Sequence, residues 1–251
     1  MQKERVRRQG RPPTMENARG KILDEAAELF AHEGFDGASL GSVAEAVGVT
    51  KAAIYHYFPN KKEIYEAIIV RTLQGLLDAV TMAVDGQHDA PEALCRFMTA
   101  HADYFETHYH GFVTMLVGYG GMENNGLLEE AQDLRDAYEE LLRSIVLAGI
   151  ANGRYRNTDS RAISRAILSM LNWMVRWFKP GHGRPASSFA MEYCEIILNG
   201  LGTNGQAMDH DKRQEPSDRR RGYENASIIK RAADPVGDSV SQQHPVNWKR
   251  N

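Results

Sequence analysis

The stretch SLGSVAEAVGVTKAAIYHYFPNKK, residues 39–62, decides the fold of this chain. Ser39 can cap a short helix, Gly48 can end it, and Thr50 can cap a second one. Two short helices joined by a tight turn form a helix-turn-helix pattern. The second helix has few apolar positions, and its other faces carry a lysine and aromatic polar groups, namely Lys51, Tyr55, His56 and Tyr57. Such a helix is suited to meet DNA phosphates and base edges.

The flanking sequence completes a three-helix unit. Apolar residues at three- and four-residue spacing predict an amphipathic helix from about residue 14 to residue 33, which Gly34 ends. Pro59 stops the second short helix, and Asn60 followed by Glu63 can start the next one. Lys61 lies in the first turn of that helix, where a positive charge opposes the helix dipole, so we expect a DNA phosphate beside it.

Residues 14–66 resemble the DNA-binding domain of the TetR family of bacterial repressors. The resemblance is carried by AELFAHEGFDGASL, residues 27–40, and by SVAEAVGVTKAAIYHYFPNKKEIYEAI, residues 42–68. Gly41 departs from the family, whose members often have a polar residue there, so the resemblance implies no DNA contact at that position. Together with the helix pattern, it implies a DNA-binding site made of Ser39, Thr50, Lys51, Ala52, Tyr55, His56, Tyr57 and Lys61.

Downstream of this unit the sequence predicts more helices. Apolar spacing indicates helices at about 61–84, 91–109, 127–152, 160–178 and 187–201, with a short apolar piece at 111–119. No segment alternates at period two, so the fold class is all-α. We expect a flexible basic arm at 1–13, a DNA-binding domain at 14–60, a helical ligand-binding and dimerisation domain at 61–202, and a disordered tail at 203–251.

The last two predicted helices have more apolar residues than one small core needs. A monomer would therefore expose part of them, and a twofold dimer would cover them. The family resemblance also implies that these helices pair between two subunits. The expected contact residues are Ile163, Ile167, Met170, Met174, Phe189, Tyr193, Ile196 and Ile197.

The segment WMVRWFKPG, residues 173–181, places Arg176 among aromatic side chains. A buried arginine needs a partner, which is an acidic side chain, a tryptophan ring or an anionic ligand. The segment resembles a TetR branch that regulates fatty-acid and sterol breakdown, and some members of that branch sense acyl-CoA thioesters. The expected ligand-binding residues are Tyr104, His108, Phe112, Met115, Tyr119, Tyr138, Trp173, Arg176 and Trp177.

His101, His108 and His110 raise the question of a metal site. Their spacing places the first two on one helical face and the third elsewhere, so we predict ordinary core or pocket histidines and no metal or cofactor.

The rest of the composition bounds the function class. The 251 residues have a net charge of −3, whereas residues 1–21 carry a net charge of +5, which favours a polyanionic partner for that end. Cys95 and Cys194 stand alone in helical patterns, which favours a reducing cytoplasm. No apolar run approaches the roughly 18 residues that span a bilayer.

The sequence therefore predicts a cytoplasmic, dimeric, ligand-responsive repressor. Its partners would be a palindromic double-stranded DNA operator and a small-molecule inducer, such as an acyl-CoA thioester or another lipid-derived anion. Three alternatives stay open: a regulator that senses a neutral or cationic hydrophobic compound, an acyl-thioester enzyme, and a sequence-independent DNA packer. No GxSxG, HExxH or phosphate-loop motif favours the enzyme, and the acidic second domain disfavours the packer.

Overall fold

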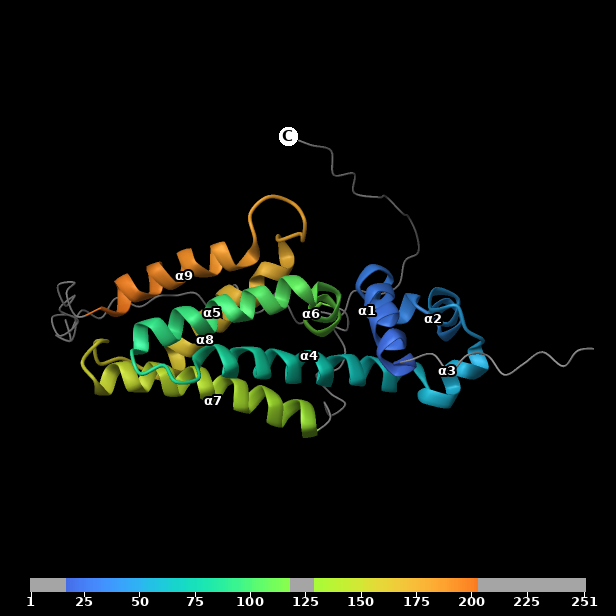
Figure 1. Ribbon diagram of the computed structural model, residues 1–251, viewed down its shortest axis with the longest axis horizontal. Helices are drawn as coiled ribbons and strands as arrows, with labels where there is room; N and C mark the ends of the chain where they lie inside the picture. Colours follow the sequence, from blue (N-terminus) through green and yellow to red (C-terminus); the bar gives the residue numbers. More distant parts are fainter. Residues whose placement is uncertain (1–16, 118–128, 203–251) are drawn as a thin grey trace, which may run out of the picture. The chain divides into compact units, whose positions relative to one another are not determined.

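The computed structural model describes residues 17–117 and 129–202. The chain divides into two units, residues 1–207 and 208–251, and everything described lies in the first. Apart from an isolated bridge between Tyr155 and Gly202, the described residues form helices and turns, which confirms the all-α prediction. The helices, shown in Figure 1, are α1 (Ala18–Gly37), α2 (Leu40–Val47), α3 (Lys51–Tyr57), α4 (Lys61–Val84), α5 (Ala90–Thr107), α6 (Tyr109–Leu116), α7 (Glu129–Ala151), α8 (Ser160–Trp173), the 3-10 helix η2 (Met174–Arg176) and α9 (Ala186–Leu201).

The predicted caps delimit the first helices. The Ser39 side chain accepts a hydrogen bond from the Ser42 backbone N–H at 3.0 Å, and Thr50 and Asn60 cap α3 and α4 in the same way. Each cap satisfies a backbone donor that the helix itself leaves unpaired. Gly34, with φ of 76°, interrupts α1 instead of ending it, because the helix resumes and extends to Gly37.

Two hydrophobic cores form along the chain, and α4 contributes to both. The first core joins α1, α2, α3 and the beginning of α4 through residues such as Phe30, Ile54 and Ile68. The second core joins the end of α4 to α5 through α9, with Leu94, Phe97 and Leu142 fully buried. A single helix therefore connects the helix-turn-helix to the second core (Figure 1).

α4 also corrects one sequence-based expectation. By length and composition it is apolar enough to cross a membrane, so the statement that no such run exists was wrong. Core helices meet the same criterion, and a single helix of this kind is weak evidence for a span. In the structure, Ile64, Leu73, Leu76 and Val80 of α4 are buried against the other helices.

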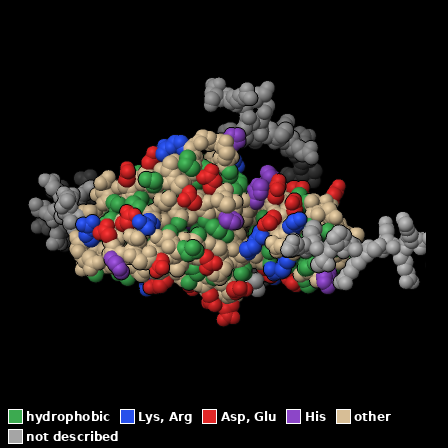
Figure 2. Space-filling model, viewed as in Figure 1, with side chains coloured by type: hydrophobic (Ala, Val, Ile, Leu, Met, Phe, Trp, Pro, Cys, Tyr) green, Lys and Arg blue, Asp and Glu red, His purple; other side chains and the backbone are tan. Residues whose placement is uncertain are grey.

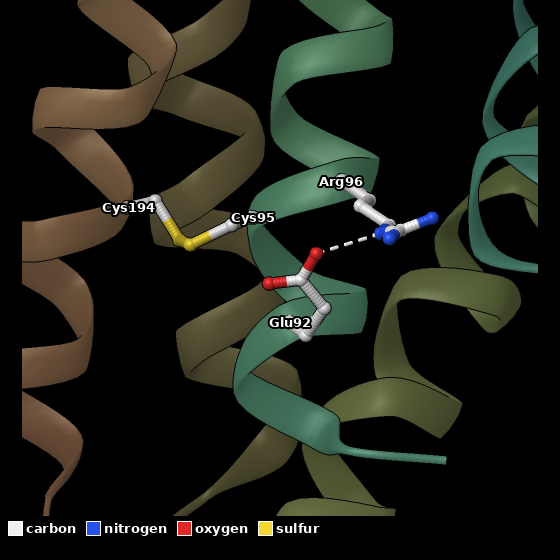
Figure 3. The surroundings of a disulfide bond; sticks show 4 residues. All are labelled: Glu92, Cys95, Arg96 and Cys194. Atoms are coloured by element: carbon white, nitrogen blue, oxygen red, sulfur yellow. Dashed lines mark hydrogen bonds and ion pairs between the residues drawn. A yellow bond between two sulfur atoms is a disulfide. The ribbon is translucent and has the colours of Figure 1, made fainter. Parts of the chain in front are cut away.

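The prediction that the two cysteines stand alone is contradicted. Cys95 of α5 and Cys194 of α9 form a disulfide with a Cα–Cα distance of 5.5 Å (Figure 3). They lie 99 residues apart in the sequence, so only the packing of α9 on α5 brings them together. The cysteine pattern therefore no longer favours a reducing compartment.

Other boundaries differ in detail. α8 ends at Trp173, where a single predicted helix was expected to continue to residue 178, and η2 follows it. The apolar piece after residue 110 is helical, as α6. The expected basic arm at 1–13, the candidate ligand residue Tyr119 and the expected disordered tail at 203–251 lie outside the described residues.

Candidate DNA-binding and ligand sites

α3 presents a polar and aromatic surface. Ile54 is buried in the first core, whereas Tyr55 and Tyr57 are 48% and 39% exposed. Lys51, Ala52 and His56 lie on the same short helix, and Lys51 and His56 are exposed. The Lys51 ammonium lies 5.9 Å from the centre of the Tyr55 ring. The helix is thus anchored by one side, and its polar and aromatic side chains are exposed on the others.

Ser39 and Thr50 have structural tasks that the sequence also predicted. The backbone N–H of Ser39 donates to the Ser42 hydroxyl, and the Ser39 hydroxyl accepts from the Ser42 N–H, so both groups stabilise the start of α2. Thr50 accepts from the Ala53 N–H at 3.2 Å and remains exposed. Since this bond uses only the acceptor side of the Thr50 hydroxyl, its proton stays available for a phosphate oxygen.

The structure corrects the role expected for Lys61. Its ammonium donates hydrogen bonds to the backbone carbonyls of Phe35 and Ala38, the latter at 2.9 Å. It also lies 4.4 Å from the centre of the Phe35 ring. A cation at the carbonyl end of a helix is favourable, so the Lys61 ammonium caps the C-terminal end of α1. Because its protons are used inside the domain, Lys61 is no longer a candidate phosphate contact.

Several candidate ligand residues of the second domain lie next to one another, with the Tyr104 and Phe112 ring centres 6.1 Å apart. Phe112 and Tyr138 lie in the second core, and Met115 packs against both cores. Tyr104 and His108 stack on each other with ring centres 4.0 Å apart, and both line a cavity of about 720 Å³ next to α1. Of the described candidate ligand residues, Tyr104 and His108 line this cavity, whereas Phe112, which packs against Tyr104, does not.

Tyr138 has a partner that sequence reasoning missed. Its hydroxyl lies 2.6 Å from Nδ1 of His101, and both side chains are buried. Burial lowers the pKa of His101 from 6.5 to about 3, so the ring is neutral. Nε2 of His101 has no hydrogen-bond partner among the described residues. The two residues are 37 positions apart on different helices, and no local sequence signal joins them.

This pair holds two polar protons and only one internal hydrogen bond. If Tyr138 donates to Nδ1, the proton on Nε2 has no acceptor; if Nδ1 donates, the tyrosine proton has none. Either tautomer leaves one buried donor unsatisfied, which costs about 1–3 kcal/mol.

One of the partners expected for Arg176, a tryptophan ring, is found within the subunit. Arg176 is exposed, and its guanidinium lies 5.8 Å from the centre of the Trp173 ring. Trp173 and Trp177 are themselves 64% and 42% exposed. Within one subunit the stacking alternative therefore describes this residue.

The eight expected contact residues, from α8, η2 and α9, divide by burial. Ile167 and Met174 are completely buried inside the subunit, which removes them from any contact surface. Ile196 is 61% exposed, and the other five, Ile163, Met170, Phe189, Tyr193 and Ile197, are partly exposed. Met191, which the expected set omits, is 55% exposed on α9.

The three histidines of the metal question also separate. His101 bonds Tyr138, His108 stacks on Tyr104, and His110 contacts His32 with ring centres 5.5 Å apart. Within residues 17–117 and 129–202, no three His, Cys, Asp or Glu side chains are grouped to hold a metal ion.

Comparison with known proteins places the chain in a family. Residues 22–68 match the model for bacterial regulatory proteins of the tetR family, and residues 87–201 match the tetracyclin repressor-like C-terminal domain. The crystal structure of the TetR family transcriptional regulator PfmR from Thermus thermophilus is 43% identical, with a TM-score of 0.66, over 72% of this chain and 98% of that one.

Two further relatives share a name. The HTH-type transcriptional repressor KstR2 of Rhodococcus jostii (strain RHA1) is 24% identical over 76% of this chain and 98% of its own length. The structure of the ketosteroid transcriptional regulator KstR2 of Mycobacterium tuberculosis is 23% identical, with a TM-score of 0.68, over 75% of this chain and 97% of that one. With both of its domains matched by family models, this chain belongs to the TetR family of helix-turn-helix transcriptional regulators.

Proposed function

We propose that this regulator is a dimeric, ligand-responsive repressor that binds a palindromic operator and is released by a small-molecule inducer. The observation that carries the proposal is the link between α3 and the second core. Only residues 58–60 separate α3 from α4, and α4 contributes to both cores. A change in the packing of the second-domain helices can therefore be transmitted to α3, the helix proposed to recognise DNA. The proposed division is a DNA-binding domain at 14–60 and a sensing domain at 61–202.

A second connection supports this coupling. The Thr114 hydroxyl of α6 donates to the backbone carbonyl of Ala27 in α1 at 3.1 Å. The Tyr65 hydroxyl of α4 donates to the carbonyl of Thr114 at 2.9 Å. Both bonds are buried, so α6 holds α1 and α4 at once. An inducer that favours a shifted α6 would therefore reorient the helix-turn-helix.

Dimerisation gives that reorientation its effect. The exposed apolar side chains Met191 and Ile196 belong to α9 and would be covered by a second subunit. A twofold dimer places two copies of α3 against the two half-sites of a palindrome. Because both copies must fit at once, a change in their spacing weakens operator binding.

The proposed inducer is an acyl-CoA thioester or another lipid-derived anion. Arg176 lies exposed beside Trp173, where it can meet an anionic group. The unsatisfied donor of the His101–Tyr138 pair, among Phe97 and Phe112, would suit a carbonyl oxygen on an apolar molecule. The name of the ketosteroid transcriptional regulator KstR2 also agrees with a lipid-derived ligand.

A second candidate function is a regulator that senses a neutral or cationic hydrophobic compound. The neutral His101 and its aromatic neighbours favour it, because they offer no charge to an anion. An acyl-thioester enzyme is the weakest alternative, because the family consists of regulators. The proposal is therefore that the protein is not an enzyme and that it acts in the cytoplasm. Recovery of an acyl-CoA thioester unchanged after incubation would separate a sensor from a hydrolase.

The proposal is tested by fluorescence anisotropy with a labelled palindrome from the regulator's own promoter region. Tyr55→Ala should weaken operator binding by about tenfold or more, because it removes an exposed side chain of α3. Met82→Ala, a change at a still more exposed position on α4, should leave the affinity unchanged. Unaltered binding by Tyr55→Ala would contradict the assigned interface.

The same complex then identifies the inducer class. Acyl-CoA thioesters, free fatty acids and a hydrophobic cation are titrated against the operator-bound protein. Release by the thioesters alone supports the anion proposal, and release by the cation alone supports the second candidate.

A further inference from the structure

A cavity of about 720 Å³ lies where the helix-turn-helix meets the second domain. We name it the junction cavity. Its walls come from α1, α4, the α5–α6 corner and the segment after η2, and include Glu25, Glu28, Thr72, His108 and Lys179. Figure 2 shows histidine and acidic side chains over α1 and α6, with Lys and Arg side chains among them. A ligand here would contact both domains.

The cations of the junction cavity already have partners. Arg71 forms an ion pair with Asp24 at 2.7 Å. The Lys179 ammonium donates to the Tyr109 hydroxyl at 3.0 Å and lies 5.5 Å from the centre of that ring. The positively charged groups of Arg71 and Lys179 therefore interact with Asp24 and Tyr109.

The acceptors, in contrast, are largely unused. Glu25 and Glu28 lie one turn apart on α1, and neither forms an ion pair or hydrogen bond with another described residue. Nδ1 of His108 lies 3.1 Å from the Tyr104 carbonyl, and because a carbonyl oxygen only accepts, Nδ1 is the donor of this bond. Glu106 also lines the cavity, but it accepts from the Ala186 N–H at 2.7 Å.

A nearly buried threonine without a partner gives a second, independent sign of a ligand. Thr72 is only 4% exposed, lines the cavity and forms no hydrogen bond with another described residue. A Cβ at Gly111 would lie 2.6 Å from the Thr72 Oγ1, so the glycine leaves the hydroxyl its place between α4 and α6. Among the described residues, the fully buried side-chain atoms without a partner are Nε2 of His101, the Tyr155 hydroxyl and Oγ of Ser164, so Oγ1 of Thr72 keeps access to the cavity.

We propose that the junction cavity binds an organic amine, whose ammonium group donates to Glu25, Glu28 and the Thr72 hydroxyl while its apolar body packs on the Tyr104–His108 stack. An ammonium supplies three donors and a positive charge to a wall that offers two carboxylates and a hydroxyl. This site goes beyond the proposed inducer and requires neither operator nor acyl-CoA, so its test is made on the protein alone.

The test uses three probes of matched size and different charge: phenethylamine, phenethyl alcohol and phenylacetate. Isothermal titration calorimetry on the full chain at about pH 7.5 should show binding of the amine and at least roughly tenfold weaker binding of the alcohol and the carboxylate. Glu25→Gln with Glu28→Gln should weaken amine binding at least about tenfold, and Thr72→Val should weaken it severalfold, because each removes an acceptor and keeps the side-chain shape.

Glu33→Gln is the matched control, since Glu33 is an exposed carboxylate of α1 outside the cavity lining. It should bind the amine like the unmodified protein. Absence of amine binding, equal binding of the alcohol, or an undiminished affinity of the Glu25→Gln, Glu28→Gln variant would overturn the proposal. Failure of the operator experiment would leave this result unaffected.

Discussion

At the residue scale, His101 and Lys61 are polar side chains whose roles depend on the groups packed around them. Lys61 reaches from the start of α4 to the last carbonyls of α1, so its charge stabilises the first domain. His101 is held neutral in the second core beside Tyr138. A histidine whose pKa is depressed on folding makes the stability of the protein depend on pH.

The direction of that dependence follows from the two pKa values. The unfolded chain binds a proton at His101 below about pH 6.5, whereas the folded protein does so only near pH 3. The contribution of His101 to the free energy of unfolding is therefore fully present above pH 6.5 and is lost as the pH falls towards 3. Between about pH 7.5 and pH 5 the free energy of unfolding should fall by about 2 kcal/mol through His101 alone.

Urea unfolding of the unmodified protein and of His101→Gln at both pH values measures this effect. The variant keeps a polar side chain but does not titrate, so its stability should fall by about 2 kcal/mol less than that of the unmodified protein over the same pH interval. The same pH dependence in both proteins would show that His101 is accessible to protons when folded.

At the element scale, α5 and α9 are joined covalently as well as by packing. The disulfide between Cys95 and Cys194 closes a loop with a sequence separation of 99 residues. α6, α7 and α8 lie within that loop, so the bond restricts most of the second domain in the unfolded chain. Longer loops give larger stabilisation in the chain-entropy model.

Reduction should therefore lower the free energy of unfolding by up to about 4 kcal/mol. Because Cys194 is fully buried, the protein is reduced while unfolded and then refolded in reductant before guanidinium unfolding. The Cys95→Ala, Cys194→Ala variant serves as the control, and its stability should not respond to reductant. Equal stability of the oxidised and reduced proteins would mean that the two thiols are not joined in solution.

At the scale of the whole molecule, the proposed dimer joins the sensing helices to the spacing of two recognition helices. The exposed side chains that support it belong to α8 and α9, and Ile196 is prominent among them at 61% exposure. Two charges brought into such a contact would repel each other and remain poorly solvated.

Ile196→Glu should accordingly shift the protein from dimer to monomer and weaken operator binding, while its helix content by circular dichroism stays the same. Met82→Glu, at a more exposed apolar position of α4, should remain dimeric. Sedimentation velocity decides the matter, and a dimeric Ile196→Glu protein would exclude a contact surface around this residue.

The sequence alone determined the local features of the molecule. The caps at Ser39, Thr50 and Asn60 depend on hydrogen bonds between residues three positions apart, and the exposed surface of α3 depends on the scarcity of apolar residues in one short helix. Because these interactions join residues that are close in the sequence, the helix-turn-helix and the all-α class could be predicted.

Tertiary structure decided everything that depends on distant residues. It directed Lys61 to α1, paired Cys95 with Cys194 and His101 with Tyr138, and exposed Arg176. It also buried Ile167 and Met174 and left Ile196 outside, although all three are apolar residues at helical spacing. Periodicity shows that a helix has an apolar face, but only packing shows which neighbour covers each side chain on it.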